Sequence, residues 1–263
     1  MKDVLDEIIA WKRIEVARQK EQISPRALYA AVEKIMTDGI EVESMSKALH
    51  NDAHGIIAEF KRKSPSKGWI KEEGKPEIVP PSYEQNGAAA LSILTDEKFF
   101  GGSMEFIKIA RPLVNIPILR KDFVIDEYQL FQAREIGADA VLLIAADLKK
   151  EEVKSLTSLA HELKLEVLLE MHSFEELDYA EFDVDMLGIN NRNLGTFHTD
   201  VQNSFQMISH LPANKVKVSE SGINSPEVIK LLREAGYRGF LMGEYFMKQP
   251  NPGTALKAFT EKL

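Results

Sequence analysis

Short apolar runs alternate with amphipathic stretches along most of the chain, from Ile56 to the C-terminal end. Each run is six to eight residues long, which is a usual length for a buried strand. The pattern predicts eight strands, at residues 56–61, 89–94, 116–121, 138–145, 166–171, 185–190, 215–220 and 239–244.

The amphipathic stretches after the strands predict helices. They lie at residues 103–112, 126–136, 149–163, 173–180, 200–209, 225–235 and 253–262. Three of them have start signals. Ser173 with Glu176 three residues later has the form of a capping box, Asp147 precedes a turn rich in lysine and glutamate, and Ser225-Pro226 is typical of a helix entry.

The N-terminal segment, residues 1 to about 50, has a different pattern. Apolar residues recur at helical spacing after Leu5, and residues 26–35 form a second amphipathic segment after Pro25. Residues 62–88 are rich in glycine and proline, so we expect an extended loop there before a short helix.

Eight strands, each followed by a helix, are enough to close a (β/α)8 TIM barrel, an α/β fold. We therefore expect residues 1–263 to form a single barrel domain with an N-terminal helical extension. An open, doubly wound sheet is the alternative. It is disfavoured because no Gly-x-Gly-x-x-Gly turn follows an early strand.

Composition excludes several classes of function. The 263 residues contain no cysteine, which rules out disulfides, thiolate metal sites and a cysteine nucleophile. The formal net charge of −8 disfavours nucleic acid as a partner. No signal peptide is recognisable and no stretch approaches the about 20 apolar residues that cross a membrane, so we expect a soluble, cytoplasmic protein without a membrane partner.

Charged and polar residues gather where the predicted strands end. Since the carboxyl ends of barrel strands form the active site, these residues are the candidates for chemistry. They are Glu59 and Lys61 at the end of the first strand, Lys121 at the end of the third, Glu170 at the end of the fifth, Asn190 at the end of the sixth with Arg192 beyond, Glu220, Ser221 and Gly222 at the end of the seventh, and Gly243 and Glu244 at the end of the eighth.

Each of these residues also has an ordinary interpretation. A lone lysine at a strand end is usually solvated, Glu170 could be a structural ion-pair partner, and Asn190 or Ser221 could satisfy loop backbone. Together, however, two lysines and two glutamates would meet at one mouth, from the first, third and fifth strands. Because unpaired buried charges are costly, they must pair with each other, with water or with a ligand. Such clusters are what proton-transfer chemistry needs.

A small anion is the expected ligand. Glycines in "SESGI" after the seventh strand and in "MGE" after the eighth allow backbone N–H groups to approach an anion, as in the usual barrel phosphate site. A basic cluster, "KRKSPSK" (residues 61–67), could add positive charge and the hydroxyl of Ser64. The plain alternative for this cluster is a solvated loop.

Seven motifs resemble the indole-3-glycerol-phosphate synthase family. They are "IIAEFKRKSPSKG", "LTDEKFFGGS", "PILRKDFVID", "GADAVLLIAA", "LLEMH", "GINNRNL" and "VSESGI", and the resemblance covers essentially the whole chain. It implies a (β/α)8 barrel with the N-terminal helices over its mouth. It also implies closure of the indole ring of 1-(2-carboxyphenylamino)-1-deoxyribulose 5-phosphate, with loss of CO2 and water, without a metal or organic cofactor.

The resemblance also implies roles for residues. Lys121 looks like a general acid acting on substrate oxygens, and Glu170 like the general base of the dehydration. Lys61 is expected to bind the substrate carboxylate or to act as an acid itself, and which lysine serves which step stays open. Glu59 would orient and tune the lysines, and Asn190 would hold a substrate hydroxyl.

Further residues are expected to bind the substrate. Arg192 would support the mouth electrostatically, and Glu220 is placed with the substrate-binding residues. Ser64, Ser221, Gly222, Gly243 and Glu244 resemble a phosphate site, and Phe100, Phe123, Leu142, Leu194 and Met242 would surround the aromatic ring.

Three expectations concern single side chains. We expect burial and neighbouring charge to lower the pKa of the acid lysine toward neutrality. Because a carboxylate repels phosphate, Glu244 should contact it through its backbone N–H. His172, two residues past Glu170, is expected to have a structural or solvent-facing role in a loop.

Three rival functions remain. A barrel similar to phosphoribosylanthranilate isomerase would need a thiol and an aspartate at its strand ends, and the chain has no cysteine. A Schiff-base aldolase would use Lys121, and a scaffold barrel would recruit a partner through residues 1–50. We expect a small phosphorylated substrate, one activity per chain, and a monomer or weak homo-oligomer.

Overall fold

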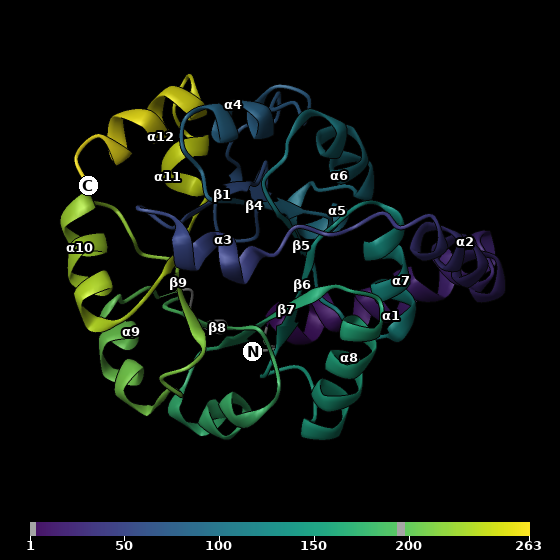
Figure 1. Ribbon diagram of the computed structural model, residues 1–263. Helices are drawn as coiled ribbons and strands as arrows, with labels where there is room; N and C mark the ends of the chain where they lie inside the picture. Colours follow the sequence, from purple (N-terminus) through teal and green to yellow (C-terminus); the bar gives the residue numbers. More distant parts are fainter. Residues whose placement is uncertain (1–3, 194–197) are drawn as a thin grey trace.

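The computed structural model describes residues 4–193 and 198–263. Its centre is a closed barrel of eight strands, in which every strand is parallel to its neighbours (Figure 1). The strands are β1 (Ile56–Phe60), β4 (Ala90–Leu94), β5 (Ile118–Lys121), β6 (Ala140–Ile144), β7 (Glu166–Met171), β8 (Met186–Asn190), β9 (Val216–Glu220) and β10 (Gly239–Met242). The predicted (β/α)8 barrel is therefore confirmed.

Apolar side chains fill both sides of the barrel wall. Ile57 and Leu119 belong to a cluster inside the barrel, whereas Ile56 and Phe60 belong to a larger cluster beneath the surrounding helices. β1 is buried at every position, because both faces of a parallel strand are covered. Alternation then turns Glu59 inward with Ile57, which places a charge in the barrel near its mouth.

Helices surround the barrel (Figure 1). They are α4 (Val79–Gln85), α5 (Glu97–Phe100), α6 (Met104–Ala110), α7 (Glu127–Glu135), α8 (Lys150–Glu162), α9 (Gln202–Met207), α10 (Pro226–Ala235), α11 (Glu244–Met247) and α12 (Pro252–Thr260). Three short 3-10 segments accompany them: η1 (Arg111–Leu113), η2 (Phe174–Glu181) and η3 (Ile208–His210). None of the helices in the described part of the chain is long and apolar enough to span a bilayer.

Two of the three predicted helix starts need correction. The helix expected at 173–180 is the 3-10 segment η2, and Ser173 makes no capping hydrogen bond. Glu176 instead accepts the backbone N–H of His172 at 2.7 Å. At α8 the N-cap is Lys149 and not Asp147. The third start is confirmed, because Ser225 caps α10 ahead of its first-turn proline.

The long connection after β1 contains more structure than the sequence predicts. β2 (Lys63–Ser64) and β3 (Gly68–Trp69) pair as a small antiparallel hairpin, and the expected short helix follows as α4. The hairpin brings the basic cluster back over the carboxyl ends of the strands.

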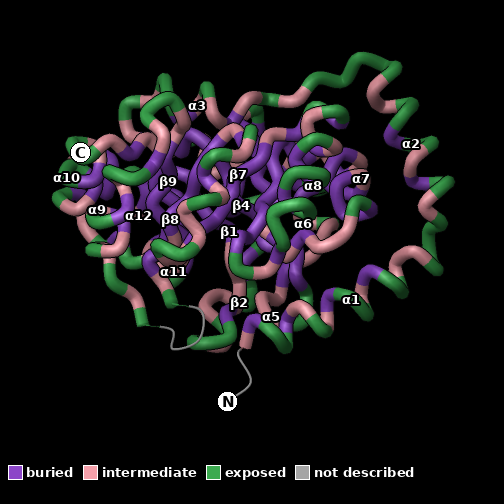
Figure 2. Tube along the Cα trace, turned by 90° about the horizontal axis from the view of Figure 1, so that it is seen from below, coloured by how far each residue is buried: buried purple, intermediate pink, exposed green. Residues whose placement is uncertain are grey.

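The N-terminal extension is divided between three faces of the barrel (Figure 2). In α1 (Val4–Gln22), Lys12 forms ion pairs with Asp96 and Asp122, which follow β4 and β5, so this helix lies across the mouth. In α2 (Pro25–Thr37), Tyr29 stacks on Phe131 of α7, with ring centroids 3.8 Å apart, on the outer surface.

The third helix, α3 (Met45–Asn51), closes the opposite end of the barrel (Figures 1 and 2). Leu49 belongs to the inner apolar cluster, and the backbone N–H of Ser46 donates to Glu166 at the start of β7. The expectation that residues 1–50 as a whole lie over the mouth is therefore wrong for α2 and α3. It fails because these segments have apolar faces that match other parts of the barrel.

Candidate active site

Lys121 lies at the centre of a buried charge cluster at the mouth. Its Nζ is 2.6 Å from Oε2 of Glu170 and 2.9 Å from Oε2 of Glu220. β5, β7 and β9 supply the three residues at or near their carboxyl ends. The side chain of Lys121 is 15% exposed and those of both glutamates are nearly inaccessible. The three residues therefore form one electrostatic unit.

A second pair lies beside this unit. Lys61 Nζ is 2.5 Å from Glu59 Oε1, and Ser92 of the adjacent strand donates to Glu59 Oε2 at 3.4 Å. The two lysines and three glutamates come from four strands, as the strand-end pattern predicts. Lys61 is the more accessible lysine, with 20% of its side chain exposed.

Two glycines leave room for the buried carboxylates. A Cβ at Gly188 in β8 would lie 2.5 Å from Glu220 Oε1, which no real packing tolerates. A Cβ at Gly243 would similarly collide with the carboxylate of Glu59. Gly243 was expected at a phosphate site; it lines the outer cavity and also makes space for Glu59.

The pKa of Lys121 differs from the expectation. Burial alone would lower the pKa of this ammonium, but the charges of Glu170, Glu220 and Glu59 outweigh burial and raise it. The expectation of a lowered lysine pKa is therefore wrong for this structure. Lys121 is an ammonium over the whole physiological pH range.

The two carboxylates on Lys121 differ in proton affinity. Burial would raise the pKa of Glu170, but the charges of Lys121 and His172 hold it well below its usual range. Burial raises the pKa of Glu220 to about 7, helped by the negative charge of Glu170 and opposed by Lys121. Two neighbouring carboxylates with separated pKa values are typical of an acid–base site.

An apolar inner cavity of about 130 Å³ adjoins the charge cluster. Phe100 and Phe123 form part of its wall, with ring centroids 6.0 Å apart, and Leu142 lines it as predicted. Leu5 and Ile8 of α1 cover it. A planar aromatic ring would therefore lie between apolar walls and two ammonium groups.

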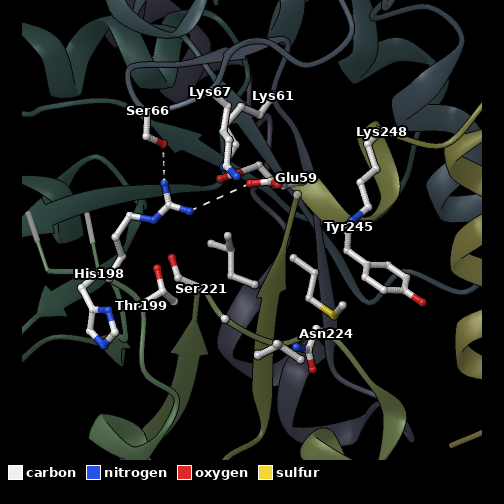
Figure 3. A pocket seen from close by; sticks show the side chains of 17 residues that line it. Glu59, Lys61, Ser66, Lys67, His198, Thr199, Ser221, Asn224, Tyr245 and Lys248 are labelled. Carbon is white, nitrogen blue, oxygen red and sulfur yellow. Dashed lines mark hydrogen bonds and ion pairs between the residues drawn. The ribbon is translucent and has the colours of Figure 1, made fainter. Parts of the chain in front are cut away.

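A polar outer cavity of about 580 Å³ opens next to the inner one. Lys61 and Lys67 extend into it from one side, and Ser221 lies on the opposite side (Figure 3). Ser221 has a φ of 66° and Gly222 a φ of 74°. A positive φ is uncommon for a residue other than glycine, so the conformation of Ser221 suggests a functional constraint at this turn.

Other predicted residues also lie at these cavities. Asn190 lines the inner cavity, and its Oδ1 accepts the backbone N–H of Arg192 at 3.0 Å. Arg192 lines both cavities and donates to Ser66 at 3.0 Å. Glu244 lines the outer cavity, 4.0 Å from Arg192. Met242 also lines the outer cavity, not the inner one.

Two predicted residues need separate comment. Ser64, expected to contact phosphate, lines the inner cavity and accepts a hydrogen bond from Lys67 N–H. Ser66 takes its place in the outer cavity. Leu194 lies outside the described residues.

Sequence reasoning missed several lining residues. In the outer cavity these are Ser66, Asn224, Tyr245 and Lys248 (Figure 3), and in the inner cavity Leu5 and Ile8. Ser66 and Lys67 belong to the basic cluster, so a signal was present there. Leu5 and Ile8 could not be distinguished from ordinary core positions of a helix.

His172 is buried beside Glu170. Its side chain is only 9% exposed, and its Nε2 lies 3.1 Å from Glu170 Oε1. The solvent-facing alternative is therefore wrong.

Among residues 4–193 and 198–263, no group of three His, Asp or Glu side chains is arranged to hold a metal ion.

Comparison with known proteins gives a consistent result. Residues 5–259 match the model of the family described as Indole-3-glycerol phosphate synthase. The chain is 60% identical over 263 residues to the indole-3-glycerol phosphate synthase of Bacteroides thetaiotaomicron, with 100% of both chains covered. It is 44% identical to the enzyme of the same name from Dechloromonas aromatica, covering 97% of this chain and 98% of that one.

Solved structures show the fold alone. A thiamine phosphate pyrophosphorylase from Pyrococcus furiosus matches with a TM-score of 0.60 at 16% identity, covering 83% of this chain and 96% of that one. The N-acetylmannosamine-6-phosphate 2-epimerase of Clostridium perfringens matches with a TM-score of 0.57 at 15% identity, covering 82% and 96%.

Proposed function

The chain belongs to the indole-3-glycerol phosphate synthase family, whose members are carboxy-lyases of tryptophan biosynthesis, and from this premise we propose how its site performs the reaction. The substrate of that reaction is 1-(2-carboxyphenylamino)-1-deoxyribulose 5-phosphate, a chain with an aromatic acid at one end and a phosphate at the other. The observation that carries the proposal is Lys121, held between two carboxylates beside an apolar cavity.

The two cavities match the two ends of this substrate. We assign the aromatic ring to the inner cavity, between Phe100, Phe123 and Leu142, where Lys61 can pair with its carboxylate. We assign the phosphate to the outer cavity, near Ser221, Gly222 and the basic hairpin. The substrate hydroxyls would then pass Asn190 and Arg192, which line the inner cavity.

Ring closure needs an acid. The ring carbon that bears the carboxylate attacks the substrate carbonyl, and Lys121 stabilises the oxygen that becomes a hydroxyl by donating to it. Loss of CO2 then restores the aromatic ring. The ammonium form of Lys121 suits this role, because a fixed positive charge is most effective where negative charge develops. Lys61, paired with Glu59, is the second ammonium within reach and the other candidate acid.

Dehydration needs an acid and a base together. The departing hydroxyl takes a proton from a lysine, and a carboxylate removes a proton from the substrate so that the indole double bond forms. Glu170 suits the base because its pKa is held low and it is therefore ionised. Lys121 Nζ lies 2.6 Å from Glu170 Oε2, so a proton that the carboxylate takes up can pass to the lysine after the lysine has donated its own.

The test follows indole fluorescence on addition of the substrate to purified protein. The wild type should turn over, whereas Lys121→Ala should lose roughly 10²- to 10⁴-fold in kcat while still binding a product analogue. Glu170→Gln should lose a similar factor. Near-normal turnover of Lys121→Ala would contradict the acid assignment. A covalent adduct at Lys121 after borohydride treatment with substrate would favour the aldolase instead.

Three wider expectations are also proposals. We propose that residues 1–263 act as one domain, that the protein works in the cytoplasm, and that it is a monomer or weak homo-oligomer. Limited proteolysis, cell fractionation and light scattering at several concentrations test them in turn. A stable isolated fragment, a membrane-associated activity or a tight dimer would each contradict one.

A further inference from the structure

His172 lies just beyond the strand that carries Glu170. β7 ends at Met171, so side-chain alternation directs His172 to the same side as Glu170, one step nearer the mouth. Its side chain is 9% exposed, and it is not among the described residues that line either cavity. His172 can therefore influence the reaction only through its neighbours.

The two oxygens of Glu170 face two different cations. Oε2 lies 2.6 Å from Lys121 Nζ, and Oε1 lies 3.1 Å from His172 Nε2. The other ring nitrogen, Nδ1, lies 3.7 Å from Glu176 Oε2 of η2. The imidazole is therefore placed between two carboxylates, an arrangement that favours its protonated form.

The backbone of His172 is held from two elements. Its N–H donates to Glu176 Oε2 at 2.7 Å, and its carbonyl accepts from Asn203 Nδ2 of α9 at 3.0 Å. Glu176 thus binds the backbone and lies beside the ring of the same residue. These bonds limit the positions from which the ring can meet Glu170.

Glu220 lacks a comparable partner. Its Oε2 also lies on Lys121, at 2.9 Å, but Glu220 forms no ion pair with a second cation in the described part of the chain. One ammonium cannot fully compensate two buried carboxylates, so one of the two is the better place for a proton. The groups that decide which are Lys121 from β5, Glu59 from β1 through Lys121, and His172 and Glu176 on the Glu170 side.

We propose that His172 is a positioning residue that makes Glu170, rather than Glu220, the more readily ionised carboxylate beside Lys121. This rests on the proposed function, in which Glu170 removes a proton from the substrate. The electrostatics agree with the geometry. Burial opposes the charge of His172, but its contacts with Glu170 and Glu176 raise its pKa to about 10, so the ring is positive throughout the working pH range.

The kinetic test compares pH profiles. His172→Gln keeps a polar side chain and removes the charge, so Glu170 should take up a proton more easily. The acid limb of kcat/KM should then move to higher pH by about one to two units, with KM changed less than kcat. Above that limb, kcat should return to within a few fold of wild type. Glu176→Gln should give a smaller shift in the opposite direction or none, because it removes only a neighbouring negative charge.

His161→Gln is the matched control. His161 Nε2 also pairs with a carboxylate, Asp185 at 2.9 Å, but it lines neither catalytic cavity in the described part of the chain. This variant should keep the wild-type pH profile. If His172→Gln lowers kcat equally at every pH, or leaves the acid limb unmoved, the proposal is overturned and the role of His172 is structural.

A second measurement does not depend on turnover. Nitrogen NMR of the imidazole, assigned by the signal that His172→Gln lacks, should show a doubly protonated ring at about pH 8 in the wild type. In Glu170→Gln the same ring should titrate at least one unit lower. A neutral ring in the wild type would overturn the proposal even in an active enzyme. A charged ring in a protein without turnover would instead refute the proposed function alone.

Discussion

At the scale of single residues, the site contains more buried carboxylates than lysines to pair with them. Glu59, Glu170 and Glu220 are each at most 3% exposed, and Lys61 and Lys121 are their two lysine partners. Buried carboxylates with too little compensation are costly, so their exact spacing sets both stability and protonation. Small changes next to them should have large effects.

Gly188→Ala tests this spacing. The added Cβ would lie 2.5 Å from Glu220 Oε1, so the carboxylate must shift from its position beside Lys121. We expect kcat to fall by about 10- to 100-fold and the free energy of unfolding by about 1–3 kcal/mol. Steady-state kinetics and denaturant unfolding measure the two. Gly253→Ala is the control, because its added Cβ would collide with Ser82, which lies outside the site. This variant should lose stability and keep kcat.

Glu220 should make stability depend on pH. Its pKa is raised from 4.5 to about 7, so between these values the folded state holds a proton that the unfolded state releases. The contribution is therefore complete below about pH 4.5 and lost as the pH rises through about 7. Glu220→Gln cannot titrate, so it should gain on the order of 2 kcal/mol relative to wild type between about pH 5 and pH 8. An equal difference in unfolding free energy at both pH values would contradict this.

At the scale of elements, α1 is attached to the mouth by a buried charge. Lys12 is 0% exposed and lies 2.9 Å from Asp96 and 2.8 Å from Asp122. The attachment places Ile8, one turn before Lys12, and Leu5, two turns before it, over the inner cavity. A buried ion pair of this kind is a weak source of stability but a strong determinant of position.

Lys12→Met should therefore affect both stability and substrate binding. It leaves two buried aspartates short of a partner, which costs about 3–5 kcal/mol. KM should rise more than kcat falls, because the apolar cover of the inner cavity loosens. Lys20→Ala on the same helix is the control, since its partner Asp126 is 31% exposed and the loss should stay below about 1 kcal/mol. A Lys12→Met protein with unchanged KM would show that α1 is not needed for the cavity.

At the scale of the whole molecule, the candidate active site and the closing helix α3 lie at opposite ends of the barrel. The charge cluster lies at the carboxyl ends of the strands, and α3 covers the amino ends. Met45 and Leu49 of α3 are 0% exposed and join the apolar cluster inside the barrel. Layers of apolar side chains lie between the two ends, so a change at the α3 end should alter stability without altering the reaction.

Leu49→Ala tests this separation. Removing a fully buried leucine should lower the free energy of unfolding by about 2–5 kcal/mol. The folded variant should keep kcat and KM within about two-fold, because the cavity left behind is on the far side of the barrel from Lys121. Thermal melting and kinetics at a temperature well below the transition measure the two. A fall in kcat comparable with that of Gly188→Ala would contradict the separation.

The barrel and the placement of most candidate site residues at one mouth follow from the chain alone, for a physical reason. Strand alternation and the rule that barrel sites lie at carboxyl ends are local or topological, so Glu59, Lys61, Lys121 and Glu170 could be assigned to one mouth without coordinates. The family motifs extend over the same positions.

Tertiary structure alone decided the electrostatics and the route of the extension. The packing of side chains from different strands determines that Lys121 pairs with both Glu170 and Glu220. The charges of these glutamates raise the pKa of Lys121, where the sequence predicted a lowered pKa. Contacts between segments that are distant in the sequence also fix the separate positions of α1 and α3. The contact of the His172 ring with Glu170 likewise depends on how the chain folds back after β7. Charge balance and docking depend on such distances, which no local pattern in a sequence contains.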